Sequence, residues 1–294
     1  MRLKIRCGLV LTVLALELIL LCSSGILAED DTISSPGPME EQMANPPGLG
    51  NPEVHQIAVN VYAVTGLYHP AGDDVGVSAG IIFADNSIVF IDAGMSVASG
   101  EFLWQLAEEM MAGDEDLYLI LTHRHSDHVF GMRVVKEQGA KVIAHRILKD
   151  WFGQMGDRYR QFIVSKMGWD AERGDEILGE VLLFPPDHVI EHDTVLTLDG
   201  EEIHVLATPG HLYDELSVYH PNSKTLFAGD AVYQGIPPHT GFGGPEEWRL
   251  WISQLERLKQ LEIGTVVPGH GKLCSKNEID RNIACLKDEI SKTK

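Results

Sequence analysis

The chain has 294 residues, of which 44% are hydrophobic and 22% are charged, so neither disorder of the whole chain nor a multi-span membrane protein is expected. Its length fits one large domain or two small ones. Asp and Glu number 43 against 23 Lys and Arg, and the net charge of -20 would repel a phosphate backbone, which excludes nucleic acid as the expected partner.

Residues 1–28 have the composition of an export signal. Basic residues precede an apolar run from Cys7 to Leu21, which is interrupted by Glu17 and followed by small residues. Because Glu17 lies within the run and no clean cleavage site follows it, the segment is expected either to be removed or to stay as a membrane anchor. In both cases the protein is exported and faces the outside, with possible tethering to the membrane.

Residues 29–52 hold five prolines and few residues that could build a core, which predicts a disordered linker. Residues 53–294 are then the folded domain. Its cysteines, Cys274 and Cys285, are too few for a disulfide framework and are expected to be unpaired.

The first half of this domain alternates predicted strands with predicted helices. Apolar and β-branched runs predict strands at 57–65, 79–83, 88–91, 117–121 and 141–145. Apolar residues at helical spacing predict helices over 97–111 and 129–138. Residues 148–180 read as a mostly helical insertion whose aromatic residues could form a lid.

The second half repeats the pattern. Strands are predicted at 195–198, 203–207, 216–219, 225–228 and 265–267, and helices over 245–260 and 276–290. Each half would supply a sheet covered by its own helices. The sequence therefore predicts an α+β fold, a four-layer αββα sandwich in which loops from both halves meet along one edge.

Four segments place histidine or aspartate directly after a predicted strand. The first of them, residues 122–128, contains His123, His125, Asp127 and His128. In an extended loop alternate side chains leave on the same side, which brings the first three together, and His128 begins the next helix. Four candidate ligands within six residues suit two metal ions better than one.

The other three segments place glycine beside each candidate ligand. They are residues 208–211, 228–230 and 267–271, and they contribute His211, Asp230 and His270. Glycine allows the tight turn that aims its neighbour at a shared point. Imidazole and carboxylate without thiolate suit zinc, with iron or manganese as alternatives. Six further histidines are expected to be structural or surface residues: His55, His69, His188, His192, His204 and His220.

On these motifs, residues 55–290 resemble the metallo-β-lactamase superfamily. The ligand sets that the resemblance implies are His123, His125 and His211 for a first metal, Asp127, His128 and His270 for a second, and Asp230 as the bridge between them. It also implies that Asp92, in a strand-end Asp-x-Gly pattern, supports the ligands from behind. Arg124, between two ligands, is expected to pair with an acidic neighbour.

The residue at the bridging position indicates a branch of that superfamily. Asp230 favours the glyoxalase II-like and lactonase-like hydrolases over the true β-lactamases, many of which have cysteine or no carboxylate there. Tyr233 either matches the tyrosine with which lactonases of the family polarise the substrate carbonyl or is a rim aromatic that packs under the loop. The segment after His128 departs from the Gly-Gly pair usual in glyoxalase II.

The expected function is metal-dependent hydrolysis of an ester, thioester, lactone or amide in a small-molecule substrate. Two zinc ions would activate a bridging water, Asp127 would orient it, and Tyr233 would contact the carbonyl. The alternatives are β-lactamase activity, a mononuclear iron oxygenase of the persulfide dioxygenase kind, and a binding protein that kept the fold. Metal content separates the dinuclear hydrolase from the oxygenase.

Overall fold

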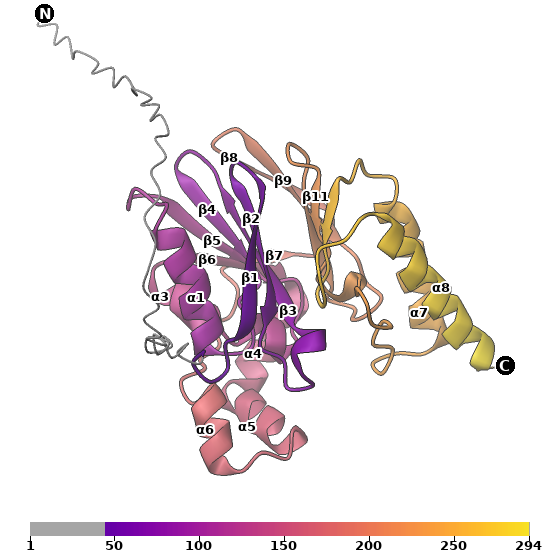
Figure 1. The fold of residues 1–294 in the computed structure, drawn as a ribbon, viewed down its shortest axis with the longest axis horizontal. Helices are drawn as coiled ribbons and strands as arrows, with labels where there is room; N and C mark the ends of the chain where they lie inside the picture. The colour runs from indigo at the N-terminus through magenta and orange to yellow at the C-terminus, as the bar shows by residue number, and fades with distance from the viewer. Residues whose placement is uncertain (1–44, 294) are drawn as a thin grey trace, which may run out of the picture. The chain divides into compact units, whose positions relative to one another are not determined.

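The computed structural model describes residues 45–293 (Figure 1). The predicted export segment, residues 1–28, and residues 29–44 of the predicted linker lie outside the described residues. Within 45–293, no helix is both long enough and apolar enough to cross a membrane. Cys274 and Cys285 are free thiols.

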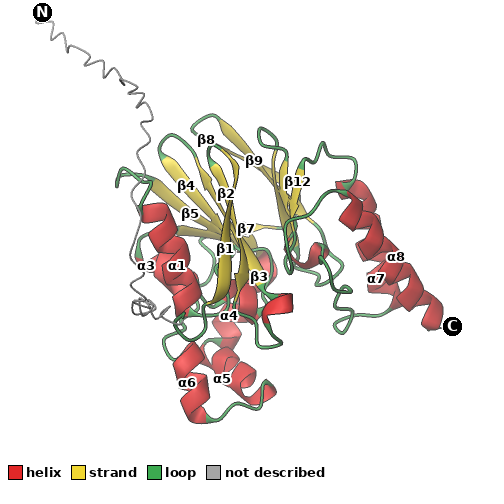
Figure 2. Ribbon diagram, in the orientation of Figure 1, coloured by secondary structure: helices red, strands yellow, loops and turns green. Residues whose placement is uncertain are grey.

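Two β-sheets lie face to face between layers of helices, which confirms the predicted αββα sandwich (Figures 1 and 2). The strands of the first sheet lie in chain order, as β1 (Gly50–Ala58), β2 (Val61–Leu67), β3 (Val77–Phe83), β4 (Ser87–Ile91), β5 (Asp116–Ile120), β6 (Lys141–His145) and β7 (His188–Ile190). Its first four strands pair antiparallel, and β4 to β7 pair parallel.

The second sheet runs in the reverse of chain order. It consists of β12 (Thr265–Val267), β11 (Thr225–Phe227), β10 (Leu216–His220), β9 (Glu201–Ala207) and β8 (Thr194–Leu198). The pair β11 and β12 is parallel, and the other pairs are antiparallel. Strand β12 reaches its place only after a helix has crossed over the sheet, as parallel neighbours require.

The helices fall into three groups. The first sheet is covered by α1 (Val97–Glu108), α2 (Ser126–Val129) and α3 (Met132–Glu137), and the second by α7 (Pro245–Leu258) and α8 (Asn277–Lys292). The predicted insertion consists of α4 (Arg146–Met155), α5 (Asp157–Lys166) and α6 (Ala171–Leu178), between β6 and β7. Short 3-10 turns, η1 (Asp73–Val75) and η2 (Gly229–Ala231), lie in loops.

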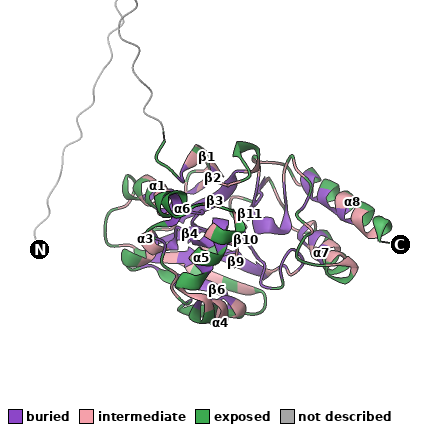
Figure 3. Cartoon of the chain, turned by 90° about the horizontal axis from the view of Figure 1, so that it is seen from below, coloured by how far each residue is buried: buried purple, intermediate pink, exposed green. Residues whose placement is uncertain are grey.

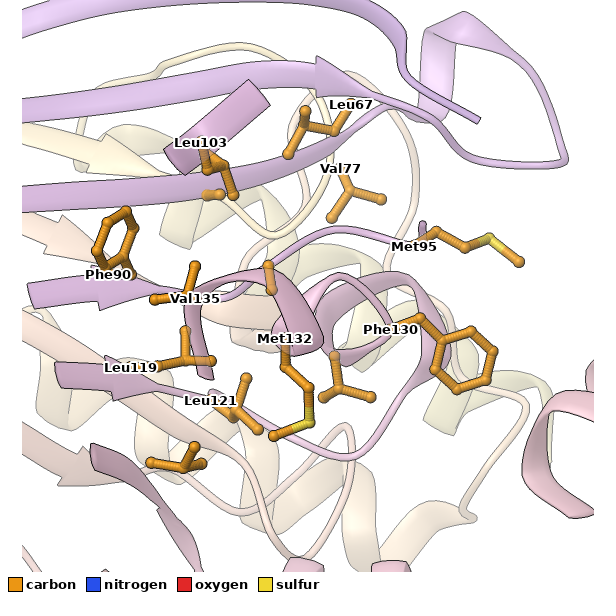
Figure 4. Packing of buried hydrophobic residues seen from close by; sticks show 14 of the residues in the cluster. Leu67, Val77, Phe90, Met95, Leu103, Leu119, Leu121, Phe130, Met132 and Val135 are labelled. Carbon is orange, nitrogen blue, oxygen red and sulfur yellow. The ribbon is translucent and has the colours of Figure 1, made fainter. Parts of the chain in front are cut away.

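Three apolar layers hold these elements together. The side chains in Figure 4 belong to the layer between the first sheet and its helices, where Leu103 of α1 and Val135 of α3 meet strand residues such as Leu119. A second layer fills the space between the sheets, and a third packs α7 and α8 on the second sheet. Figure 3 shows the consequence: the inner strands are largely buried and the outer helix faces are exposed, while the edge strands β1 and β8 have no buried residue.

The sheets approach closely at Gly80 of β3. A Cβ atom built on Gly80 would lie 2.2 Å from the ring of Phe227, which comes from β11 in the other sheet. No side chain fits in that gap, so glycine sets the separation of the two sheets at this point.

The N-terminal boundary differs from the expectation. Residues 50–52 of the predicted linker begin β1, and Leu49 before them is buried. The carbonyl of Gly48 accepts hydrogen bonds from the hydroxyls of Ser96 and Ser99. Prolines at 46, 47 and 52 therefore do not keep this part of the segment out of the fold, because contacts with residues far along the chain fix it.

Two elements were missed or merged. The predicted strand 57–65 is the end of β1, a turn and the start of β2, and Val59 in the turn is 91% exposed. Because Val59 is β-branched, the turn has the sequence pattern of a strand, and the two strands were predicted as one. Strand β7 has three residues, too few for a period to be visible. The remaining predicted strands match the structure to within a few residues, and so do the helices predicted over 245–260 and 276–290.

We expect Gly80→Ala to lower the free energy of unfolding by about 1 to 3 kcal/mol, because the added methyl group overlaps Phe227. The matched control is Gly153→Ala in α4, where a Cβ meets nothing within 4 Å; that variant should be as stable as the parent or up to about 1 kcal/mol more stable. Urea unfolding measures both. Equal stability of the two variants would show that the sheets have room at Gly80.

Candidate metal centre

The four histidine and aspartate segments lie at one edge of the sandwich. They follow β5, β9, β11 and β12, so two sheets contribute to the same site. Backbone hydrogen bonds join the sheets there: the amide of Leu216 donates to the carbonyl of Thr122 at 2.8 Å, and the amide of Ser78 donates to that of Gly269 at 2.9 Å. The loops are thus fixed by main-chain contacts before any ligand binds.

One group of candidate ligands contains the predicted first-metal residues. His123 Nε2 and His211 Nε2 lie 3.0 and 3.1 Å from His125 Nδ1. Asp230 Oδ2 lies 3.3 Å from His211 Nε2 and 3.7 Å from His123 Nε2. These four residues offer one atom each within a sphere that could hold a metal ion.

A second group contains the predicted second-metal residues. Asp127 Oδ2 lies 3.3 Å from His270 Nε2 and 3.8 Å from His128 Nε2. The other oxygen of Asp230, Oδ1, lies 3.1 Å from His128 Nε2 and 3.3 Å from His270 Nε2. The carboxylate of Asp230 therefore presents one oxygen to each group.

Two observations fit metal ions at these positions. Tetrahedral coordination at about 2.0 to 2.2 Å places ligand atoms about 3.3 to 3.6 Å apart, close to the separations found here. In addition, His128 Nε2 and Asp230 Oδ1 are buried and make no hydrogen bond to any residue of 45–293. Buried polar atoms are rarely left without a partner, and a divalent cation would satisfy both.

The far ring nitrogen of each Nε2 ligand is held by an acceptor. His270 Nδ1 donates to the carbonyl of Val75 at 2.7 Å, and His211 Nδ1 donates to that of His239 at 3.2 Å. This tautomer leaves the Nε2 lone pair free and fixes the plane of each ring. The orientation of the ligands is thus set by the backbone.

Asp92 holds two more ligands. Its Oδ2 accepts from His128 Nδ1 at 2.8 Å and from the hydroxyl of Thr122 at 2.8 Å, and that hydroxyl accepts from His123 Nδ1 at 3.0 Å. Its Oδ1 accepts from the Thr122 amide. Asp92 has a φ of 59°, which costs backbone energy in a residue other than glycine, and its place behind both ligand groups agrees with the supporting role implied by the sequence.

The two groups differ in protonation when metal is absent. Burial lowers the pKa of His125 to about 3 and that of His211 to about 4, so both are neutral. Burial acts downward on His270 too, but the charge of Asp230 and the hydrogen bond with Asp127 raise its pKa to about 10. Burial would raise the pKa of Asp230, yet His270 and the other histidines hold it well below its usual range.

Tyr233 is buried against these ligands. Its hydroxyl donates to Asp230 Oδ2 at 2.5 Å, and its ring stacks on His270 at 5.2 Å between centroids. The hydroxyl lies on the bridging carboxylate, and Tyr233 also lines the adjacent cavity. The predicted contact of Tyr233 with a substrate carbonyl stays a prediction.

The structure brings His69 to the site, although the sequence predicts a structural or surface role for this residue. His69 Nδ1 accepts from the Ala71 amide at 3.2 Å, which leaves the proton on Nε2, and Nε2 lies 3.8 Å from Asp127 Oδ2. No spacing in the sequence links His69 to the later ligands. The one indication was the position of His69 in the loop between β2 and β3, which also supplies Val75.

The structure also places Arg124, Glu215 and two of the histidines for which a structural role is predicted. Arg124 pairs with Asp214, as expected from its position between two ligands. Glu215, which sequence reasoning missed, accepts from the Asp230 amide at 2.9 Å and lies 3.5 Å from His123 Nδ1. Of the histidines assigned structural roles, His220 is buried on Glu201 at 2.7 Å and His55 bonds Thr65 at 2.9 Å, both away from the metal centre.

A cavity of about 920 Å³ opens beside the ligands. The insertion forms one wall with Trp151, Tyr159, Phe162, Ile163, Lys166 and Met167. Another part of the lining is the loop after Asp230, from Ile236 to Phe242, and it includes His239. The cavity is therefore polar at the candidate metal centre and apolar on the sides that a substrate would touch.

Comparisons with known proteins agree with this arrangement. A family model described as the metallo-beta-lactamase superfamily matches residues 72–270. A probable metallo-hydrolase, YqgX of Bacillus subtilis, is 29% identical over 66% of this chain and 84% of its own length. The hydroxyacylglutathione hydrolase GloC of Haemophilus influenzae is 28% identical over 64% of this chain and 81% of its own.

A solved structure has the same fold. The metallo-beta-lactamase from Pontibacter korlensis superimposes with a TM-score of 0.62 over 81% of this chain and all of that one, at 22% identity. Similarity at this level of identity concerns the arrangement of sheets and helices and does not extend to the substrate.

The protonation of His270 makes metal binding release protons. At pH 8 a group with a pKa of about 10 is protonated, and it must lose that proton to give Nε2 to a metal. We expect zinc titrated into the metal-free protein to release about one to two protons per chain, from His270 and His128. Calorimetry in two buffers of different ionisation enthalpy measures this number. Binding without proton release would contradict the charge state assigned to the second group.

Proposed function

Because the chain belongs to the metallo-beta-lactamase superfamily, whose model matches most of its folded part, we propose that it is a hydrolase with two zinc ions and a carbonyl substrate. The observation that carries the proposal is the orientation of Asp230. Its two carboxylate oxygens face separate groups of ligands, which is the geometry of a bridge. A single-metal oxygenase would need only one of those groups.

When bound, two divalent cations would lower the pKa of a water molecule and polarise the carbonyl that it attacks. The residues of the chain position these components. Asp127 Oδ2 faces the other ligands of the second group. In that position Asp127 would orient the attacking water and accept the proton of that water. Nε2–H of His69 would donate to the substrate beside Asp127.

Tyr233 has two roles in this proposal. The hydrogen bond to Asp230 fixes the plane of the carboxylate between the two groups. Tyr233 also lines the cavity, and its hydroxyl would exchange Asp230 for the substrate carbonyl as acceptor when substrate binds. Buried Glu215 holds the amide of Asp230 from the other side. Because these donors are fixed before substrate arrives, little reorganisation is needed in the transition state.

The substrates that we propose are small-molecule esters, thioesters, lactones or amides. The relative named hydroxyacylglutathione hydrolase supports a thioester or a related acyl compound, while relatives named metallo-beta-lactamase type 2 support testing a cephalosporin. The apolar walls of the cavity favour an acyl or ring group of moderate size.

We expect Asp230→Ala to lose at least half of the bound zinc and about 1000-fold or more of the hydrolytic rate, because each metal loses a ligand. Metal content is measured per chain, and hydrolysis is measured on a thioester, an acyl-homoserine lactone, an aryl ester and a cephalosporin. Asp114→Ala, in an exposed loop, is the matched control and should change neither. Full activity in Asp230→Ala would refute the dinuclear proposal, as would one iron per chain with oxygen consumption.

We also propose that the protein is exported, on the composition of residues 1–28. Expressed as the full chain in a bacterial host, it should be recovered outside the cytoplasm, either shortened at the N-terminus or bound to the membrane. Fractionation followed by intact-mass measurement checks this. Recovery of the unshortened chain from the cytoplasm would contradict it.

A further inference from the structure

The cavity beside the metal centre contains a charge that no contact within residues 45–293 neutralises. Its charged lining residues are Arg124, Asp127, Lys166 and Asp230. The two aspartates are predicted metal ligands, and Arg124 is paired with buried Asp214. Lys166 forms no ion pair with a described carboxylate, and its contact in the cavity is the face of Phe242. Its ammonium group is therefore available to a ligand.

Lys166 lies at the end of α5, close to the ligands. Its Nζ is 5.5 Å from the centre of the Phe242 ring, and that ring centre is 4.5 Å from the ring centre of His125. One aromatic ring thus separates the ammonium from a predicted metal ligand. The path between them runs along the Phe242 side chain and the apolar wall of the insertion.

The aromatic side chains along this path are unusually exposed. Phe162 is 52% exposed and Phe242 is 46% exposed, and both line the cavity. Large apolar side chains gathered on a concave surface indicate a place where an apolar group binds. The cavity therefore offers a polar reaction centre, an apolar stretch and then a positive charge.

Building on the proposed hydrolase function, we infer that the substrate carries a carboxylate separated from its reacting carbonyl by an apolar segment long enough to pass the Phe242 ring, and that Lys166 binds this carboxylate. An ammonium on a flexible stem suits a single anionic group on a ligand of variable length. A chain with a net charge of -20 repels anions over most of its surface, so an exposed cation in the lining of the cavity gives an anionic substrate a specific place to bind.

A structural role for Lys166 predicts something different. If the ammonium only held Phe242 over His125, its removal would affect neutral and anionic substrates equally. A binding role affects the anionic substrate alone. A pair of substrates that differ in the carboxylate and in nothing else near the reacting bond separates the two roles.

The test uses the zinc-loaded full-length protein and two p-nitrophenyl esters, the octanoate and the half-ester of octanedioate. We expect the parent protein to prefer the half-ester. Lys166→Met should lower kcat/KM on the half-ester by about three- to tenfold, mostly through KM, and leave the octanoate unchanged. Lys166→Arg should keep the preference. Lys149→Met, an exposed lysine of α4 outside the cavity, should behave as the parent.

Binding of octanedioate and octanoate, measured by calorimetry, gives a second readout that needs no turnover. The parent should bind octanedioate more tightly, and Lys166→Met should bind both alike. If esters are hydrolysed but Lys166→Met keeps the preference of the parent in both assays, the inference about Lys166 is wrong and the proposed hydrolysis stands. If no ester is hydrolysed but octanedioate binding depends on Lys166, the inference about Lys166 stands and esters are excluded from the proposed substrates.

Discussion

The structure depends on one buried carboxylate. Asp230 is 2% exposed and is surrounded by imidazole nitrogens from His123, His128, His211 and His270, with its two oxygens turned to different groups. A charge in such a place is costly unless it is paired on every side. The surrounding loops are arranged so that histidines and a tyrosine hydroxyl reach it, while the Glu215 side chain accepts a hydrogen bond from the backbone amide of Asp230. Divalent cations would supply the partner that Asp230 Oδ1 does not have among residues 45–293.

The fold supplies this arrangement by joining two sheets at one edge. Hydrogen bonds from Leu216 and Ser78 connect loops of opposite sheets, and the ligands follow the ends of strands whose other residues form the core between the sheets. Close contact is possible because glycine precedes a ligand at several turns; a Cβ on Gly269 would lie 2.0 Å from Asp230 Oδ1. Rigid strands and short loops therefore position the ligands before metal binds.

The cavity combines this polar centre with apolar walls from another part of the chain. The insertion of α4, α5 and α6 contributes aromatic and aliphatic side chains, and the loop after Asp230 contributes Phe242 and His239. Members of one fold can differ in substrate through such segments while the metal ligands stay the same. The specificity of this protein is thus expected to reside in α5 and the Phe242 loop, where Lys166 lines the cavity and forms no ion pair within residues 45–293.

By itself the sequence determined the layered fold and the candidate ligands that the structure brings together. The prediction used local patterns: HxHxDH, the three glycine-flanked segments, and the periodicity of strands such as 117–121 and helices such as 245–260. The spacing of residues within such a segment determines which side chains leave it on the same side. Tertiary structure decided the rest. His69 reaches Asp127, Glu215 reaches Asp230, and Lys166 reaches the ring of Phe242, although dozens of residues separate the partners in two of these pairs and no pattern connects them. Contacts of this kind exist only when packed sheets and loops bring distant segments together, because only the final packing sets their distances.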